Sequence, residues 1–524
     1  MSLEPAVNML DSAWIPVRMR DGETAEMSLL TMFECASEIE ALAESSPTSL
    51  VAMYRLLLAI THRALVHEKG RWTDADRARW FRHGLPVDAI RAYLEEWRER
   101  FWLFHPRHPF MQVAALAEAE ETREKHKPWT QIALASANGN TPVMFDHAID
   151  ANPVSIPATE AFRELLGFLQ FTPGGLVKVF RGADKAGPLA NTAAVLPLGG
   201  TLGQTLMLSL HPCTDASAQD RPSWERDPPS IQNLLADPLP ATGPCDRYSR
   251  LSRAVLLRAD DDVCHRVRWI HFGAGLGLAE DPAAPDSMSS YRSGSQGLVR
   301  LGFVEGRAAW RDLGALLPDP SGQASQPAAI LSWAVNLQMA LNDLDGDLSV
   351  LLAGLASDQA KLLRWRSEHF RLPVSTLSRA DVASIVRDTL QKTEACYREL
   401  NQLLRDAIAT TLPDPKSKDT RARARELVDR SPLAAVFFSA AEQALPDLLR
   451  RVGRSELDGA EQDWARVLLG AIRRTWETAL DLLGNSTAAL RAQAQCHGRY
   501  QRLLEPLRLA VDDPSVNPIQ KGRT

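Results

Sequence analysis

The residues best suited to metal chemistry form the acidic run at positions 343–347, Asp-Leu-Asp-Gly-Asp. Carboxylates at alternate positions can surround a divalent cation, as they do in an EF-hand calcium loop. Counted from Asp343, however, the sixth position is Leu348, where that loop needs glycine. The twelfth is Gly354, where it needs glutamate. We therefore interpret the run as a polar break between two helices.

Acid–base chemistry has few candidates. His147 follows Asp146, but no nucleophile or metal partner accompanies the pair, which favours a structural histidine. A helical enzyme that acts on nucleic acid would instead use Asp358 or Glu368 with His369, and its acids would have to converge on a metal ion. The six cysteines contain no CxxC pair, so no zinc site is predicted. We assign no catalytic residue, metal or cofactor.

Positive charge gathers in one C-terminal stretch. Within ten positions that hold a single acid, five basic residues occur: Lys416, Lys418, Arg421, Arg423 and Arg425. Lysine and arginine side chains that bind phosphates make affinity fall steeply with salt concentration. A solvated helix face would show the same residues, and both interpretations stand.

Composition limits the class of protein. The 524 residues allow two to four domains at roughly 100–200 residues each. A net charge of −6 excludes a globally basic nucleic-acid binder, so any nucleic acid must meet a local patch. Sparse, scattered cysteines are typical of a reducing compartment. Without a basic–apolar leader or a long apolar run, the expected location is cytoplasmic, with no membrane partner.

The apolar patterns predict several elements in the first part of the chain. Residues 8–18 read as a buried strand before an Asp21-Gly22 turn. Helices are predicted over residues 49–65 and 80–102, and from about Thr159 to the Pro173-Gly174-Gly175 stop. Further elements are predicted at these positions: strands at 206–210, 254–257, 267–272 and 298–304, a long loop at 214–244, helix from about 328, and a charged amphipathic helix at 357–369.

The last part of the chain predicts a helical bundle. Four amphipathic stretches follow a hinge near residues 372–375, and they cover residues 379–410, 420–452, 463–483 and 486–511. Short connections between such stretches favour an antiparallel four-helix bundle. Pro432 and Pro446 should bend or break the second stretch. The predicted fold class is α+β, mainly α, with a mixed domain over residues 1–374 and a bundle over residues 375–524.

Four short segments, which we call landmarks, follow one another along the chain. They are the strand at 8–18, Arg-Leu-Leu-Leu-Ala-Ile at 55–60, His-Pro-Phe-Met-Gln at 108–112, and Phe-Asp-His at 145–147. Their order and spacing resemble the CasA family, the large subunit of the type I-E CRISPR surveillance complex, Cascade. The resemblance implies an N-terminal domain of unusual mixed fold and a C-terminal four-helix bundle.

The same resemblance implies a non-catalytic, antiviral role. The subunit would recognise the protospacer-adjacent motif (PAM) on double-stranded DNA, promote duplex opening and R-loop formation, and recruit the helicase–nuclease that degrades the target. Its implied partners are the guide RNA (crRNA) and the small, backbone and crRNA 5′-end subunits. Two alternatives stay open. Absence of PAM-dependent binding would favour a plain helical scaffold that binds only protein, and metal-dependent cleavage by the isolated protein would favour the nucleic-acid enzyme above.

The resemblance places a PAM-reading loop at Gly174 and Gly175. Glycine lets the backbone approach a base edge without a Cβ in the way. The minor groove carries a degenerate pattern, which suits a reader that tolerates several PAMs. The alternative is an ordinary helix C-cap with glycine just past the end.

The resemblance also places a glutamine wedge at Gln359, beside Asp358, with Lys361 and Arg364 following. The wedge would enter the duplex next to the PAM, where separating a base step costs a few kcal/mol. The alternative is Ser357 as a helix N-cap with an acid in the first turn.

Three further groups of residues follow from the resemblance. Arg268, and after it His271, would take the place of a lysine finger that reaches the PAM, although a solvated strand face explains both. Phe145 would be an aromatic near the PAM on a loop that contacts the guide RNA 5′ end. The bundle residues Lys416, Lys418, Arg421 and Arg423 would face the small subunits and the displaced DNA strand.

Overall fold

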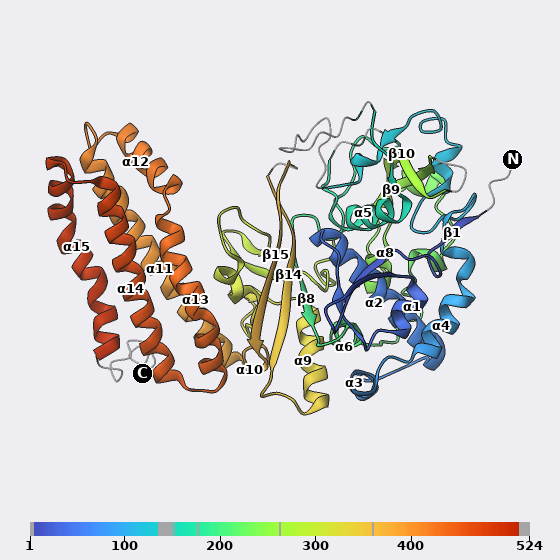
Figure 1. Ribbon diagram of the computed structural model, residues 1–524, viewed down its shortest axis with the longest axis horizontal. Helices are drawn as coiled ribbons and strands as arrows, with labels where there is room; N and C mark the ends of the chain where they lie inside the picture. Colours follow the sequence, from blue (N-terminus) through green and yellow to red (C-terminus); the bar gives the residue numbers. More distant parts are fainter. Residues whose placement is uncertain are drawn as a thin grey trace. The chain divides into compact units, whose positions relative to one another are not determined.

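The computed structural model describes residues 5–134, 150, 152–175, 177, 179–260, 264–358 and 361–512, without the side chains of 356–358, 361–364, 458 and 512. The chain divides into two compact units. The first contains residues 1–309 and 321–370, and the second contains residues 310–320 and 371–524. Small antiparallel sheets and helices form the first unit, and long helices form most of the second (Figure 1). The α+β fold class is confirmed.

The strand predicted over residues 8–18 forms only from Ile15 onward, as β2, the centre of a three-stranded antiparallel sheet, while residues 9–12 form a turn. The Asp21-Gly22 turn joins β2 to β3, and Gly22 has φ of 92°. Trp14, just before β2, is fully buried with its ring centroid 5.1 Å from that of Phe162. The strands of this sheet and of the neighbouring pair β1–β5 are β2 (Ile15–Met19), β3 (Thr24–Met27), β4 (Ile39–Leu42), β1 (Ala6–Asn8) and β5 (Trp102–Phe104).

The core of the first unit is built around α2 (Pro47–Lys69), the helix predicted over residues 49–65. It is long and apolar enough to cross a membrane, but 89% of its most apolar window is buried inside the protein. Arg55 of α2 forms a fully buried ion pair of 2.8 Å with Asp286. The other helices of this unit are α1 (Leu29–Glu34), α3 (Asp74–His83), α4 (Val87–Glu96), α5 (Ala158–Phe171), α6 (Leu202–Ser209), α7 (Ile231–Leu235), α8 (Pro244–Ser249) and α9 (Ala329–Leu341).

Two sequence predictions in this unit need correction. The helix predicted over residues 80–102 is interrupted between α3 and α4, where Gly84 has φ of 97° and Pro86 follows. The strand predicted at residues 206–210 is instead helix α6. There the hydroxyl of Thr201 accepts a hydrogen bond from the Gln204 amide at 3.2 Å, which caps a helix N-terminus.

A second sheet has β10 at its centre, paired antiparallel with β6, β7 and β9. The strands predicted at residues 254–257 and 267–272 are confirmed by β9 and β10, and the one predicted at 298–304 forms only over β12. The strands of this sheet and of the three-stranded β12–β11–β13 sheet are β6 (Lys127–Pro128), β7 (Ile156–Pro157), β9 (Arg253–Ala259), β10 (Arg266–Ala274), β11 (Tyr291–Gly294), β12 (Gly297–Arg300) and β13 (Ser325–Gln326).

The amphipathic helix predicted over residues 357–369 is wrong. This part of the chain lies in two long strands, β14 (Asp347–Asp358) and β15 (Lys361–Pro373), drawn in gold in Figure 1. With β8 (Ala193–Leu198) they form a sheet of order β15–β14–β8. Arg366 donates to the Arg307 carbonyl at 2.7 Å, and Glu368 accepts from the Ala309 amide at 2.8 Å. These tertiary bonds favour an extended strand here.

The second unit confirms the predicted bundle. α13 packs on α14, α11 on α15, and α14 on α15, and α12 lies against α11. The second predicted stretch breaks at Pro432, whereas α13 continues through Pro446. The helices are α10 (Val374–Ser378), α11 (Ala380–Thr411), α12 (Lys418–Arg430), α13 (Leu433–Gly453), α14 (Leu457–Leu483) and α15 (Thr487–Asp512).

Candidate nucleic-acid interface

The glycine loop, which we define as residues 172–186, begins where α5 ends. Thr172 caps the helix in an extended conformation, as expected for a residue that precedes proline. Gly174 and Gly175 therefore lie beyond the cap, and the helix does not need them to end. Both are exposed, and a Cβ added to Gly175 would meet open space. Gly175, with φ of 152°, exchanges backbone hydrogen bonds of 3.1 and 2.8 Å with Asp184.

A buried ion pair holds the base of the glycine loop. The carboxylate of Asp184 is fully buried and lies 3.0 Å from the guanidinium of Arg253 on β9. It also accepts the Gly275 amide at 2.9 Å. Arg253 in turn donates to the Pro173 carbonyl at 2.6 Å. The two ends of the loop are thus held by hydrogen bonds to Arg253 on β9, and its glycines remain exposed to solvent.

The hairpin of β14 and β15 approaches the end of α5, where the glycine loop begins. A Cβ added to Gly354 of β14 would lie 3.3 Å from the ring of Phe171, the last residue of α5. Gln359 follows β14 and precedes β15 but lies outside the described residues. Asp358 ends β14, and Lys361 and Arg364 lie on β15, with side chains that are not described. The structure therefore flanks Gln359 with strands instead of starting a helix there.

Arg268 and His271 lie on β10 in different environments. Arg268 is about one-third exposed and forms a two-pronged ion pair with Asp260, with nitrogen–oxygen distances of 3.0–3.2 Å. His271 is buried, and its Nδ1 lies 2.9 Å from the Thr122 carbonyl. Burial lowers the pKa of His271. Arg268 is thus the better placed of the two for a ligand at the surface. Phe145 lies outside the described residues.

The basic stretch surrounds the N-terminus of α12. Only Ala424 and Val428 of this helix are buried, so nearly all its length is surface. Four cations have no acidic partner within 4 Å in the described part of the chain: Lys416, Lys418, Arg421 and Arg423. Positive charge near a helix N-terminus opposes the helix dipole. Helix stability therefore does not explain these cations, whereas a bound phosphate would.

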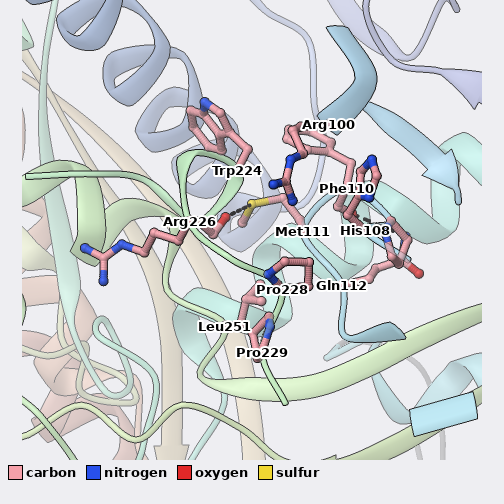
Figure 2. Close-up of a pocket in the computed structure, with 12 residues that line it drawn as sticks. Arg100, His108, Phe110, Met111, Gln112, Trp224, Arg226, Pro228, Pro229 and Leu251 are labelled. Carbon is pink, nitrogen blue, oxygen red and sulfur yellow. Dashed lines mark hydrogen bonds between the residues drawn. The ribbon is translucent and has the colours of Figure 1, made fainter. Parts of the chain in front are cut away.

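The landmark at residues 108–112 has a structural role, because it connects two parts of the first unit through hydrogen bonds. Gln112 donates to the Leu103 carbonyl at 2.8 Å and accepts the Leu257 amide at 2.8 Å, which ties this segment to β9. The cavity beside it holds about 30 Å³, room for about one water. Figure 2 shows Met111 in this cavity, with a contact of 3.2 Å from the Ser223 hydroxyl to its sulfur, and Arg226 extending away.

The acids weighed for an enzyme do not converge in the structure. Residues 343–347 form an exposed turn between α9 and β14, where the sequence predicts a break between helices. Glu368 and His369 are successive residues of β15, so their side chains point to opposite faces. Glu368 is engaged by Arg366 and by the Ala309 amide.

These features define a class: an α+β protein with a C-terminal helical bundle. Its candidate surfaces are an anchored glycine loop and a long hairpin in the first unit and, separately, a group of basic side chains in the second. The sequence profile described as CRISPR-associated protein Cse1 matches residues 8–475. The chain belongs to this Cse1 family.

Individual relatives agree over nearly the whole chain. A CRISPR-associated protein CasA/Cse1 from Thermus thermophilus is 33% identical over 515 residues, 95% of this chain and 97% of the relative. A crystal structure of CasA from Thermus thermophilus has a TM-score of 0.83 at 31% identity, with 96% and 100% of the two chains covered. A chain of a CRISPR RNA-guided surveillance complex shares the fold, with a TM-score of 0.73 at 21% identity and coverage of 95% and 100%.

Proposed function

We propose that this chain is the non-catalytic large subunit of a type I-E CRISPR RNA-guided surveillance complex, Cascade. In that role it binds target double-stranded DNA, reads the PAM, promotes R-loop formation and recruits the helicase–nuclease. Its other partners are the guide RNA and the small, backbone and 5′-end subunits. The proposal rests on one observation above all: a Cse1-family chain presents a glycine loop, fixed by Asp184 and Arg253, beside a hairpin that flanks Gln359.

In this proposal three groups of residues have different roles in binding DNA: the glycine loop, Gln359 with Arg268, and the cations of α12. The exposed backbone of the glycine loop can approach a DNA groove closely. The hydrogen bonds of Asp184 and Arg253 keep the loop in one conformation before DNA binds. Gln359, next to the end of β14, is the wedge of this proposal. Arg268 supplies a cation near the PAM, and the cations of the α12 N-terminus attract the displaced strand. Base pairing by the guide reads the remaining sequence, as in other RNA-guided effectors.

The direct test is a mobility shift of a PAM-bearing duplex with guide-RNA complex assembled with and without this subunit. The expected result is that binding and strand opening require both the subunit and an intact PAM. Equal behaviour of the two assemblies would remove the PAM-reading role and favour a scaffold that contacts only protein. Cleavage of DNA by the isolated chain with added metal would instead restore the enzyme hypothesis.

Gly175→Ala should weaken binding of the PAM duplex by about tenfold. A methyl group at φ of 152° strains the backbone by about 1–3 kcal/mol and would face the open side of the loop. Affinity is measured by fluorescence anisotropy with the assembled complex. Gly182→Ala is the matched control, because Gly182 is an exposed glycine of the same loop, with open space for a Cβ and no positive φ. Equal losses in both variants would contradict a contact at Gly175.

Replacing Lys416, Lys418, Arg421 and Arg423 together by alanine should flatten the salt dependence of R-loop stability. Each phosphate contact on a single strand contributes about 0.7 to the slope of log affinity against log salt, so the slope should fall by up to about 3. The control replaces Arg425 and Arg430, which pair with Asp429 and Glu426 on the same helix. An unchanged slope in the fourfold variant would leave these cations as a solvated helix face.

A further inference from the structure

Three potential metal ligands meet in the core of the first unit. His62 comes from α2, His211 follows α6, and Cys245 lies at the start of α8. All three side chains are buried, with exposures of 0%, 3% and 0%. The rings of Trp72, Tyr248 and Trp333 pack around the two histidines and separate them from solvent.

The distances among the ligand atoms suit a tetrahedral ion. Cys245 Sγ lies 3.7 Å from His62 Nδ1 and 3.7 Å from His211 Nε2. Zinc bonds sulfur at about 2.3 Å and imidazole nitrogen at about 2.0–2.1 Å, so tetrahedral geometry places the two ligand atoms about 3.6 Å apart. Both contacts have the usual length of a hydrogen bond between sulfur and nitrogen, and the thiol has only one hydrogen to share between them. The imidazole rings stack with planes 17° apart and would tilt from each other to converge on an ion.

A buried carboxylate lies beside His211, outside the group of three ligand atoms that all lie within 4.8 Å of one another, and would have to move toward them to become a fourth ligand. Asp220 Oδ2 lies 3.9 Å from His211 Nε2, and its carboxylate is buried. The amides of Cys245 and Asp246 donate to its two oxygens at 2.8 and 2.9 Å and fix its orientation. A Cβ at Gly243 would lie 2.4 Å from the Asp220 carboxyl carbon, so this approach requires glycine.

The charge balance of the cluster also suits a divalent cation. One thiolate and one carboxylate would together neutralise a dication, with two neutral imidazoles completing four donors. A nitrogen, sulfur and oxygen donor set of this kind suits Zn²⁺ better than Mg²⁺ or Ca²⁺.

We propose that His62, His211 and Cys245, with Asp220 as fourth ligand, form a structural zinc site in this chain. The ion would join three segments that are distant in sequence: the core helix α2, the loop that contains Asp220, and α8. It would thereby fasten the long segment between His211 and Cys245 to the core. A search for CxxC spacing cannot find such a site, because its ligands are 149 and 34 residues apart in sequence.

The test uses the full-length chain expressed with zinc in the medium. Elemental analysis should find one zinc ion per chain, and exchange for Co²⁺ should produce a thiolate-to-metal charge-transfer band with the visible bands of a tetrahedral ion. Prolonged chelation should lower the thermal unfolding midpoint, and added Zn²⁺ should restore it. Wild-type protein without bound zinc and without a cobalt spectrum would overturn the proposal, and this result does not depend on any variant folding.

Variants then assign the ligands. Cys245→Ser should lose the charge-transfer band, and Asp220→Asn should retain the band but bind the ion more weakly. Cys496→Ser is the control, because Cys496 is a buried cysteine of the bundle and its substitution should leave metal content unchanged. A charge-transfer band that survives in Cys245→Ser would show that a different thiol binds the metal and would overturn the assignment.

Discussion

Gln359→Ala should slow R-loop formation by about 10- to 100-fold while leaving assembly of the subunit into the complex intact. Separating a base step costs a few kcal/mol, and a planar amide inserted at the break offsets part of that cost. Losing about 1.4–2.8 kcal/mol of this compensation corresponds to the stated range. The rate is measured with a 2-aminopurine reporter beside the PAM, and assembly is measured by co-purification with the other subunits.

The control for this variant is Gln232→Ala, which removes an exposed glutamine from α7 of the same unit. A second substrate carries mismatched bases beside the PAM, so no base pair has to be broken there. On this duplex the Gln359→Ala complex should form the R-loop at nearly the wild-type rate. Equal rates of variant and wild type on the fully paired duplex would exclude Gln359 as the wedge. A loss of co-purification would instead assign Gln359 to assembly.

Asp184→Asn should lower the free energy of unfolding of the first unit by about 3–5 kcal/mol. Removing one partner of a buried ion pair leaves the other charge uncompensated, and the Arg253 side chain is only 3% exposed. Because Arg253 also holds the Pro173 carbonyl, the glycine loop should loosen together with the core. Urea unfolding followed by circular dichroism measures the loss, and PAM-duplex affinity of the folded variant measures the effect on the loop.

Glu40→Gln is the matched control for this stability prediction. Glu40 also pairs with an arginine, Arg18, through two bonds of 2.9 Å, but both side chains are about half exposed. Solvent screens such a pair, so its loss should change stability little. If Asp184→Asn were as mild as Glu40→Gln, the ion pair would not be what fixes the glycine loop.

The bundle was predictable because its helices are long and carry continuous apolar stripes. A pattern sustained over 32 residues, as in α11, leaves little ambiguity between helix and strand. Shorter segments are ambiguous, and the run at residues 206–210 shows how. Five apolar or small residues fit either structure, and the deciding signal is Thr201 with Gln204, an N-cap pattern that precedes the run.

The hairpin was missed for a different reason. Residues 357–369 contain several good helix formers, and their charged character fits an amphipathic helix as well as an exposed strand. What decides the outcome is tertiary: Arg366 and Glu368 bond to the backbone of residues 307 and 309. Partners so distant in sequence leave no local signal, although the alternation of exposed and half-buried residues at 365–370 agrees with a strand period.

The residues of the candidate site also separate into those with a local sequence signal and those that only the fold brings together. The helix stop at Gly174 and Gly175 was predictable because a proline followed by glycines is a local signal, and the family resemblance then assigned the loop to PAM reading. Asp184 and Arg253, which hold that loop, were not identified, since an isolated arginine or aspartate in the sequence does not indicate burial or its partner. His62, His211 and Cys245 were missed for the same reason, because only the fold brings them together.

β15 does more than flank Gln359. It begins at Lys361, ends at Pro373 and passes directly into α10, and the boundary between the two units falls inside it, after Phe370. Its 13 residues cover about 40 Å at 3.3 Å per residue. The described chain therefore runs from Lys361 to the first helix of the second unit as one continuous strand, without an intervening loop. In mechanical terms the strand is a tether, because a force applied at its start would act along backbone that is already extended.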